Sequence, residues 1–235
     1  MRCRVFSYLR VWIALVLCLG LGMQMTLHAY AVPAGIHYRH VNSANKIALT
    51  FDDGPHPRYT PEILNILAEY GVHATFFFVG ENVTYYSDVA RSVAQMGHEI
   101  GNHTYHHVSP DKQPDVHILR EELARCEQVI QQVTDTSPKL FRPPQGNWNE
   151  DLYALAREKD YEIVLWNIDT LDWAHRPAEQ IVSHVLERVQ SGDIILMHDY
   201  QSGGCTTTEA LRTLIPALME RGFHFVTVSE LLGSI

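Results

Sequence analysis

The sequence predicts an α/β fold in which about seven parallel strands form one sheet, closed as a barrel or open and doubly wound. From residue 34 onward, short β-rich runs alternate with helical stretches, and Gly or Asn stands at the boundaries. Regular alternation of this kind is typical of a parallel sheet. The length of 235 residues and the hydrophobic content of 46% suit one globular domain with a sizeable core.

Seven short runs rich in β-branched, aromatic and other apolar residues are expected to be strands. They are Ile47–Asp52, Ala74–Val79, His98–Asn102, Leu140–Arg142, Tyr161–Asn167, Asp193–His198 and Phe223–Thr227.

Helices are expected in the intervals between these runs. Thr60 is expected as the N-cap of the first helix, with Pro61 at its first position and Gly71 just past its end. Pro216 predicts a kink or a break in the last helix. The expected helices are Pro61–Tyr70, Tyr85–Met96, His117–Val133, Asp151–Lys159, Ala178–Gln190 and Thr208–Arg221.

The first 31 residues are expected to be a targeting segment. Arg2, Arg4 and Arg10 form a basic region, residues 11–23 an apolar run, and Ala29-Tyr30-Ala31 resembles a cleavage site. An uncleaved membrane anchor is the alternative, because the uncharged stretch over residues 11–34 could just span a bilayer. We therefore expect a signal peptide or anchor over residues 1–31, a short segment over 32–45 and one domain over 46–235. Such a protein is exported, and is then secreted, associated with the cell wall or anchored to the membrane.

Charge and cysteine content limit the binding partners and the covalent cross-links. The formal net charge is −9 and no run is rich in Lys or Arg, so we expect no nucleic-acid partner. Two cysteines, Cys126 and Cys205, lie beyond the leader, which is too few for a disulfide framework. A single bridge and two free thiols both remain open.

Polar residues gather at the carboxyl ends of five expected strands, where β/α folds form their sites. They are Asp52 and Asp53 at the first strand, His103 and His107 after the third, Arg142 at the fourth, Asp169 and Asp172 after the fifth, and His198 at the sixth.

A metal site is predicted from the first two of these groups. His103 and His107 are four residues apart, which on a helical turn places both rings on one face. Asp53 could complete a His₂–Asp site with positions left for water, as in catalytic zinc sites. His106 falls off that face and is expected at the surface or behind the ligands. Non-haem Fe(II) oxygenases use a similar ligand set, and a solvated Asp-Asp-Gly turn is also consistent with the sequence near Asp53.

The remaining groups suggest acid–base chemistry. The Arg142-Pro143-Pro144-Gln145-Gly146 turn fixes the direction of its free N–H groups, which could meet an oxyanion, although an ordinary proline-rich loop would look the same. Asp172 could orient a His or Arg, Trp173 offers a flat apolar wall of the kind on which sugars stack, and His198 could be a general acid or base.

Together, the five segments resemble the polysaccharide deacetylases that share the NodB homology domain, the fourth carbohydrate esterase family. The motifs are Thr-Phe-Asp-Asp-Gly, His-Thr-x-x-His, Arg-Pro-Pro, Asp-Trp and Leu-Met-His, and the match runs from about Lys46 to Leu232. The resemblance implies a distorted, TIM-barrel-like (β/α) barrel. It also implies a metal-dependent hydrolase that removes N-acetyl groups from N-acetylglucosamine or N-acetylmuramic acid units of an extracellular polysaccharide, such as peptidoglycan or chitin oligomers, and releases acetate.

The resemblance also implies a role for each motif residue. Asp52 corresponds to the general base and His198 to the general acid, while Arg142 holds the base and Asp172 tunes the acid. The resemblance further implies one divalent ion bound by Asp53, His103 and His107. Zinc is expected first, and Co²⁺ or another divalent ion is the alternative.

Substrate contacts are implied for Pro144, Gln145, Trp173 and Leu196, the last lining the pocket for the acetyl methyl group. The family usually has Tyr where this chain has Gln145. The backbone N–H that serves as oxyanion donor survives that change, whereas the contacts of the lost ring do not. Two alternatives remain: a metal-dependent amidase acting on a non-glycan linear amide, and a catalytically silent glycan-binding wall protein.

Overall fold

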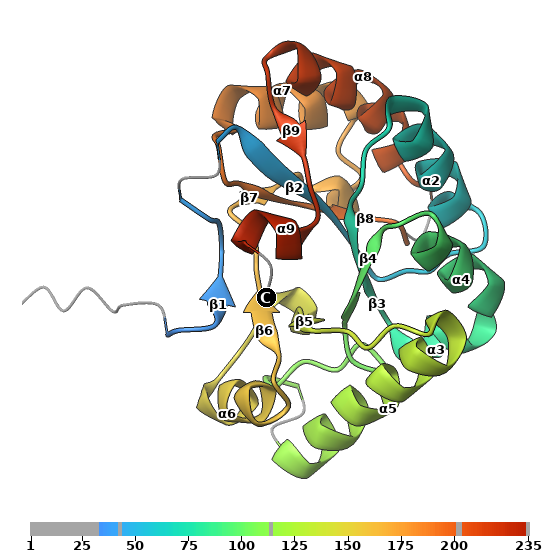
Figure 1. Cartoon of the computed structure of the whole chain (residues 1–235), viewed down its shortest axis with the longest axis vertical. Helices are drawn as coiled ribbons and strands as arrows, with labels where there is room; N and C mark the ends of the chain where they lie inside the picture. Colours follow the sequence, from blue (N-terminus) through green and yellow to red (C-terminus); the bar gives the residue numbers. More distant parts are fainter. Residues whose placement is uncertain (1–32, 42–43, 113–114, 201–203, 234–235) are drawn as a thin grey trace, which may run out of the picture. The chain divides into compact units, whose positions relative to one another are not determined.

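Within the part of the chain that the structure describes, nine strands form one sheet, and every strand pairs with its neighbours in parallel (Figure 1). The computed structural model describes residues 33–41, 44–112, 115–200 and 204–233. The expected leader over residues 1–31 lies outside this described part, and the chain from residue 34 onward forms one unit. Among the described residues, no helix is both long and apolar enough to cross a bilayer.

The sheet curls as a distorted (β/α) barrel, which confirms the expected fold class. Its strands follow the order β1-β6-β5-β4-β3-β2-β8-β7, and β9 pairs separately with β2. That path has two ends, and an isolated bridge between Arg39 and Asp193 joins the segment after β1 to the start of β8. The strands are β1 (Ile36–His37), β2 (Lys46–Asp52), β3 (Thr75–Phe78), β4 (Glu99–Asn102), β5 (Leu140–Phe141), β6 (Glu162–Val164), β7 (Ile168–Asp169), β8 (Ile194–His198) and β9 (His224–Phe225).

The strand count of seven was too low by two. The run expected as a strand over Tyr161–Asn167 contains only β6, and the unexpected β7 begins directly after it. Between the two strands, the Asn167 side chain donates to Asp193 and accepts the backbone N–H of Ile194. This contact ends β6 and starts β7 against β8. The other addition, β1, comes from the segment before residue 46, where Ile36 is buried and pairs with Ile163.

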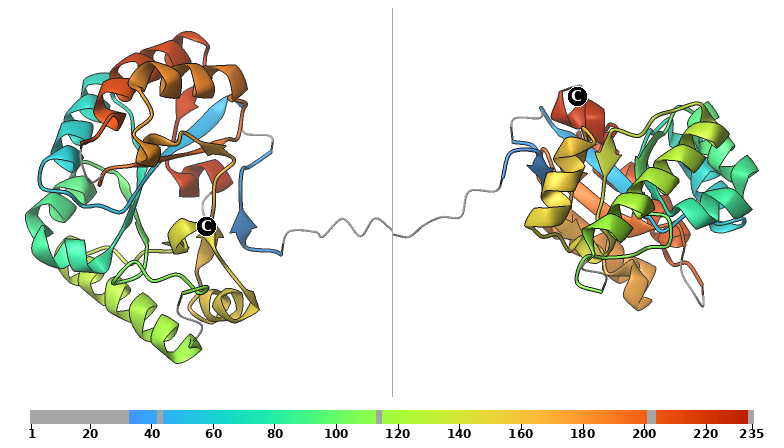
Figure 2. Two further views of the ribbon diagram at one scale, coloured as in Figure 1. Left: turned by 180° about the vertical axis from the view of Figure 1, so that it is seen from behind. Right: turned by 90° about the horizontal axis from the view of Figure 1, so that it is seen from below.

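Most helices lie along the outside of the curled sheet (Figure 2), whereas Val228 and Leu231 of the last helix pack against Ala48, Phe77 and Val164 of the strands. The helices are α2 (Tyr59–Tyr70), α3 (Gly80–Tyr85), α4 (Ser87–Gln95), α5 (Val116–Thr134), α6 (Glu150–Glu158), α7 (Ala178–Arg188), α8 (Thr207–Glu220) and α9 (Val228–Leu232), with short 3₁₀ turns at Pro144–Gly146 and Asp172–Ala174.

Several local helix predictions need correction. Thr60 is not an N-cap: α2 starts at Tyr59, two residues before the expected Pro61, and the buried Thr60 hydroxyl accepts the His56 N–H and donates to Asp199. The last long helix runs through Pro216 without a break. The short helices α3 and α9 were not expected, although Thr227 and Glu230 form the capping box of α9.

The core lies between the sheet and these helices. Every residue of β2 after Lys46 is buried, and Phe51 stacks on Phe76 of β3 at 4.9 Å between ring centroids. Cys126 is buried and Cys205 half-buried, and both are free thiols, so they do not form a bridge. The register of the central strands sets Asp52 beside His198, so the ends of β2 and β8 reach the same rim.

Candidate active site

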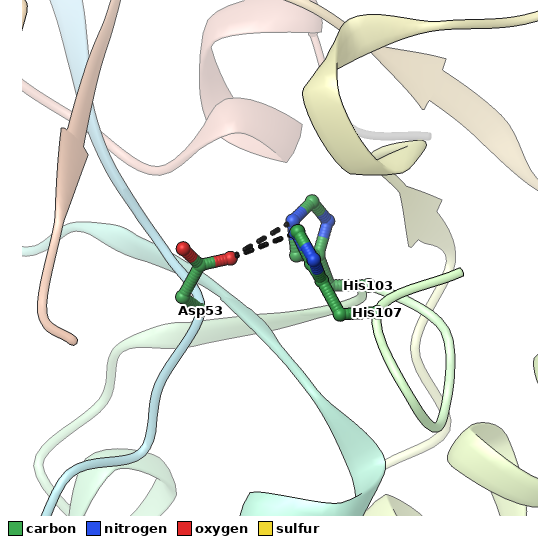
Figure 3. A group of neighbouring side chains, drawn as sticks. All are labelled: Asp53, His103 and His107. Carbon is green, nitrogen blue, oxygen red and sulfur yellow. Dashed lines mark ion pairs between the residues drawn. The ribbon is translucent and has the colours of Figure 1, made fainter. Parts of the chain in front are cut away.

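Three side chains at the carboxyl ends of β2 and β4 face one another (Figure 3). Asp53 Oδ1 lies 3.4 Å from His103 Nε2 and 3.1 Å from His107 Nε2. One ligand atom from each residue falls within 4.8 Å of the other two. Two ligands at about 2.0–2.1 Å from a tetrahedral zinc ion lie about 3.3 Å apart, which agrees with the spacing found here.

The protonation of His103 shows why this cluster needs a cation. His103 Nδ1 lies 2.7 Å from the backbone carbonyl oxygen of Arg142, which can only accept a hydrogen bond. In the neutral ring the proton is therefore on Nδ1, and the lone pair of Nε2 faces the Asp53 carboxylate. Asp53 Oδ1 is buried and has no hydrogen-bond donor among the described residues. The three residues thus fit a divalent metal ion.

The ligands reach these positions from loops and not from a helical turn, which corrects the sequence prediction. Residues 103–107 form no helix, and Thr104 and His107 have positive φ values of 64° and 57°. The Thr104 hydroxyl accepts the Val108 N–H, which closes the loop around the two imidazoles. Asp53 also has a positive φ, of 75°, and the Asn82 side chain donates to its carbonyl oxygen.

Asp52 is held by a fully buried arginine. Arg142 Nη1 donates to Asp52 Oδ1 at 2.7 Å and to the Thr50 hydroxyl at 2.8 Å. Its remaining nitrogens donate to the carbonyl oxygens of Val164 and Leu165, and the guanidinium lies over the ring of Phe77. Asp52 itself is 3% exposed, and its other oxygen, Oδ2, lies 3.8 Å from His103 Nε2. The carboxylate is thus fixed beside the candidate metal ligands with one oxygen left for other partners.

His198, at the end of the neighbouring strand β8, forms a second pair with Asp172. Its Nδ1 lies 2.7 Å from Oδ1 of the fully buried Asp172, whose Oδ2 accepts the His198 backbone N–H and the Thr207 hydroxyl. Burial lowers the pKa of His198, but the hydrogen bond and charge of Asp172, with further contributions from Asp52 and Asp53, raise it to about 9. His198 is therefore an imidazolium at neutral pH.

One pocket is lined by Asp52 and His198, one member of each pair, and by the three candidate ligands, while Arg142 and Asp172 are buried behind it. Trp173 is 54% exposed on its wall, and Gln145, with φ of 62°, enters it from the 3₁₀ turn. Pro144, expected to touch substrate, is buried and does not line this pocket. The lining residues are Asp52, Asp53, His103, His107, Gln145, Trp166, Asp169, Trp173, Leu196 and His198.

Two buried carboxylates near the site were not predicted as site residues. Asp199 directly follows His198; Thr60 donates to it at 2.5 Å, and burial raises its pKa to about 7. Glu122 of α5 binds the His106 backbone and ring. Asp199 could have been found from the sequence, because it directly follows the Leu-Met-His motif. Glu122 could not, because nothing in the helical pattern distinguishes it from a solvated helix residue.

Comparison with known proteins decides the family. The family model described as polysaccharide deacetylase matches residues 39–164. The chain belongs to the polysaccharide deacetylase family. A peptidoglycan-N-acetylglucosamine deacetylase of Bacillus cereus is 41% identical over 81% of this chain and 90% of its own. A chitooligosaccharide deacetylase of Bradyrhizobium is 34% identical over 83% of this chain and 94% of its own.

Solved structures agree with this assignment. A peptidoglycan N-acetylglucosamine deacetylase superposes with a TM-score of 0.83 at 32% identity, covering 87% of this chain and 99% of that one. The expected family, fold and class of enzyme, a polysaccharide deacetylase, are thereby confirmed. A Bacillus anthracis pseudoenzyme of the same family also superposes, with a TM-score of 0.76 at 30% identity over 86% of this chain and 70% of that one. Because the family includes a pseudoenzyme, the catalytic role of this chain depends on its own site residues.

Proposed function

We propose that this polysaccharide deacetylase is a metal-dependent hydrolase that removes N-acetyl groups from N-acetylglucosamine or N-acetylmuramic acid units of an extracellular polysaccharide and releases acetate. The observation that carries the proposal is one pocket lined by the Asp53–His103–His107 cluster and by Asp52 and His198, which the buried Arg142 and Asp172 hold in place. Together these groups could supply a Lewis acid site, a base and an acid, which amide hydrolysis requires.

In this proposal Asp53, His103 and His107 hold one divalent ion, and their two nitrogens and one oxygen suit Zn²⁺. A divalent ion held there would polarise the amide carbonyl and lower the pKa of a water molecule. Asp52 is the general base: Arg142 occupies Oδ1, which leaves Oδ2 on the side of His103 to take a proton from the attacking water.

His198 is the general acid. Its Nδ1 proton is engaged by Asp172, so the Nε2 proton of the imidazolium is the one available to the departing amine. A pKa of about 9 keeps that proton in place at neutral pH, and the amine leaves protonated as the carbon–nitrogen bond breaks.

The backbone N–H of Gln145 is the proposed oxyanion donor. Of the two N–H groups after the prolines, that of Gly146 is used by the Pro143 carbonyl oxygen at 2.9 Å. The N–H of Gln145 is the remaining candidate, and the residue lines the pocket. Leu196 and Trp173, on the same pocket wall, would contact the acetyl methyl group and the sugar ring.

The substrate proposal follows the relatives. Relatives named for peptidoglycan and for chitooligosaccharide deacetylation support an extracellular glycan, with peptidoglycan first and chitin oligomers second. The basic and apolar leader pattern over residues 1–31 supports export, followed by secretion, association with the cell wall or retention at the membrane. Mass spectrometry of the mature N-terminus tests cleavage: a chain starting near residue 32 supports it, and a chain starting at Met1 contradicts it.

The activity is tested by measuring acetate released from N-acetylglucosamine oligomers and from purified peptidoglycan, with Zn²⁺ or with a chelator. We expect metal-dependent acetate from at least one glycan, and a loss of about 100-fold or more in kcat for Asp52→Asn, the usual contribution of a general base. Ammonia or a new peptide terminus as the product would favour an amidase of another kind. Tight glycan binding by a metal-loaded protein that releases no acetate would favour a silent binding protein.

A further inference from the structure

Asp169, the last residue of β7, lines the candidate active-site pocket but has no role in the reaction proposed above. Its Oδ1 accepts two N–H groups from the residues that follow it in the chain. One is the backbone N–H of Leu171, at 2.8 Å, and the other is the indole Nε1–H of Trp173, at 3.3 Å. One carboxylate oxygen thus holds both the start of a turn and the side chain that the turn carries.

A second aspartate, three residues later, ties the same turn to the proposed general acid. Asp172 Oδ1 accepts the Trp173 backbone N–H at 2.9 Å and lies 2.7 Å from Nδ1 of His198. Leu171 and His175, on either side of the turn, have positive φ values of 58° and 55°. Non-glycine residues keep this conformation only where their surroundings hold it. The two aspartates therefore hold Trp173 by its side chain and by its backbone.

The indole of Trp173 needs such a contact because much of it faces solvent. Trp173 is 54% exposed on the pocket wall. An exposed side chain samples several rotamers, and ordering it when a ligand binds costs free energy. A hydrogen bond that is present before the substrate arrives removes part of that cost, because the ring is already in place.

We propose that Asp169 is a positioning residue, which holds the indole of Trp173 at the pocket wall in the orientation that contacts the sugar ring. Asp172 fixes the backbone of Trp173 to His198, so the indole surface and the general acid keep a constant separation. This inference rests on the proposed deacetylase function and adds to it a residue that acts through another side chain. Because Asp169 acts through Trp173, its loss should affect substrate binding and leave the chemical step largely intact.

The variants Asp169→Ala and Trp173→Phe, made singly and together, test the inference. We expect Asp169→Ala to raise KM for N-acetylglucosamine oligomers about five- to tenfold, the loss expected for one hydrogen bond, and to change kcat much less. Phe keeps an aromatic ring but has no N–H, so in the Trp173→Phe background the same substitution should change KM by less than about twofold. Asp169→Asn should recover most of the wild-type KM, because its amide oxygen can accept both N–H groups.

The indole N–H signal of Trp173 in a heteronuclear NMR spectrum reports the position of the ring without relying on activity. The signal is identified by its loss in Trp173→Phe. We expect Asp169→Ala to shift it and to speed the exchange of its proton with solvent, and Asp169→Asn to stay near the wild-type position. Asp88→Ala is the matched control, because Asp88 pairs with Arg91 on α4 and does not line the pocket. The control should leave both KM and the indole signal unchanged.

Two results would overturn the inference. An equal rise in KM with Trp173 and with Phe at that position would show that Asp169 supports only the backbone of the turn at Leu171. An indole signal that does not move in Asp169→Ala would show that the carboxylate does not hold the ring. A shifted indole signal in a protein that releases no acetate from any glycan would instead refute the proposed function.

Discussion

Replacing Arg142 with methionine tests the structural basis of the proposed base. The substitution leaves Asp52, 3% exposed, without the cation that binds its Oδ1. It also removes the donor to the hydroxyl of Thr50 and to the carbonyl oxygens of Val164 and Leu165. Removing one partner of a buried ion pair typically costs about 3–5 kcal/mol of unfolding free energy. For a domain of this size that loss lowers Tm by roughly 6–20 °C.

The assay is urea unfolding of the purified protein, followed by fluorescence and by circular dichroism. Arg91→Met is the control, because Arg91 pairs with Asp88 at the surface and should cost less than about 1 kcal/mol. The double variant Arg142→Met/Asp52→Asn should be more stable than Arg142→Met alone, since no unpaired charge remains buried. If Arg142→Met unfolds within about 1 kcal/mol of the control, the buried pair does not hold Asp52 as described.

Three further predictions follow from the same geometry. Asp172→Asn should lower the pKa of His198, because it removes the charge that holds the proton. The alkaline limb of the kcat/KM profile, expected near pH 9 in the wild type, should then move to lower pH. If the limb does not move, His198 is not the general acid. His103→Ala should weaken Zn²⁺ binding, measured by calorimetry, by more than the 10- to 100-fold usual for residues that only support a ligand, and unchanged affinity would place the metal elsewhere. Gly54→Ala should cost about 1–3 kcal/mol in urea unfolding, because a Cβ there would collide with the Asp199 carboxylate, and wild-type stability would contradict that contact.

The candidate site was largely predictable because its residues end consecutive parallel strands. Asp52 and His198 could be placed on one rim without coordinates, since both end buried apolar runs, and the register of β2 and β8 sets them side by side. Arg142 was predicted to hold the base from the family resemblance, and it contacts Asp52 at 2.7 Å.

Local backbone conformation was harder to predict. The spacing of His103 and His107 suggested a helical turn, but the positive φ of Thr104 and of His107 instead makes a loop. That loop is held partly by Glu122, which lies 16 residues after His106, and such a contact leaves no periodic pattern in the sequence. The short strand β7 was not expected, because its start beside β8 depends on the side chain of Asn167. The T-x-x-E pattern at Thr227 is a signal that could have predicted α9, which was not expected.

The central claim is that one metal-loaded pocket, with Asp52 and His198 as base and acid, hydrolyses the N-acetyl group of a glycan. It is tested most directly by adding Zn²⁺ in steps to metal-free protein and measuring acetate release from N-acetylglucosamine oligomers and peptidoglycan at each step. The account predicts that the rate rises linearly and levels off at one ion per chain, and that Asp52→Asn binds the same ion without the activity. Full activity without metal, or none from either glycan at full occupancy, would contradict it.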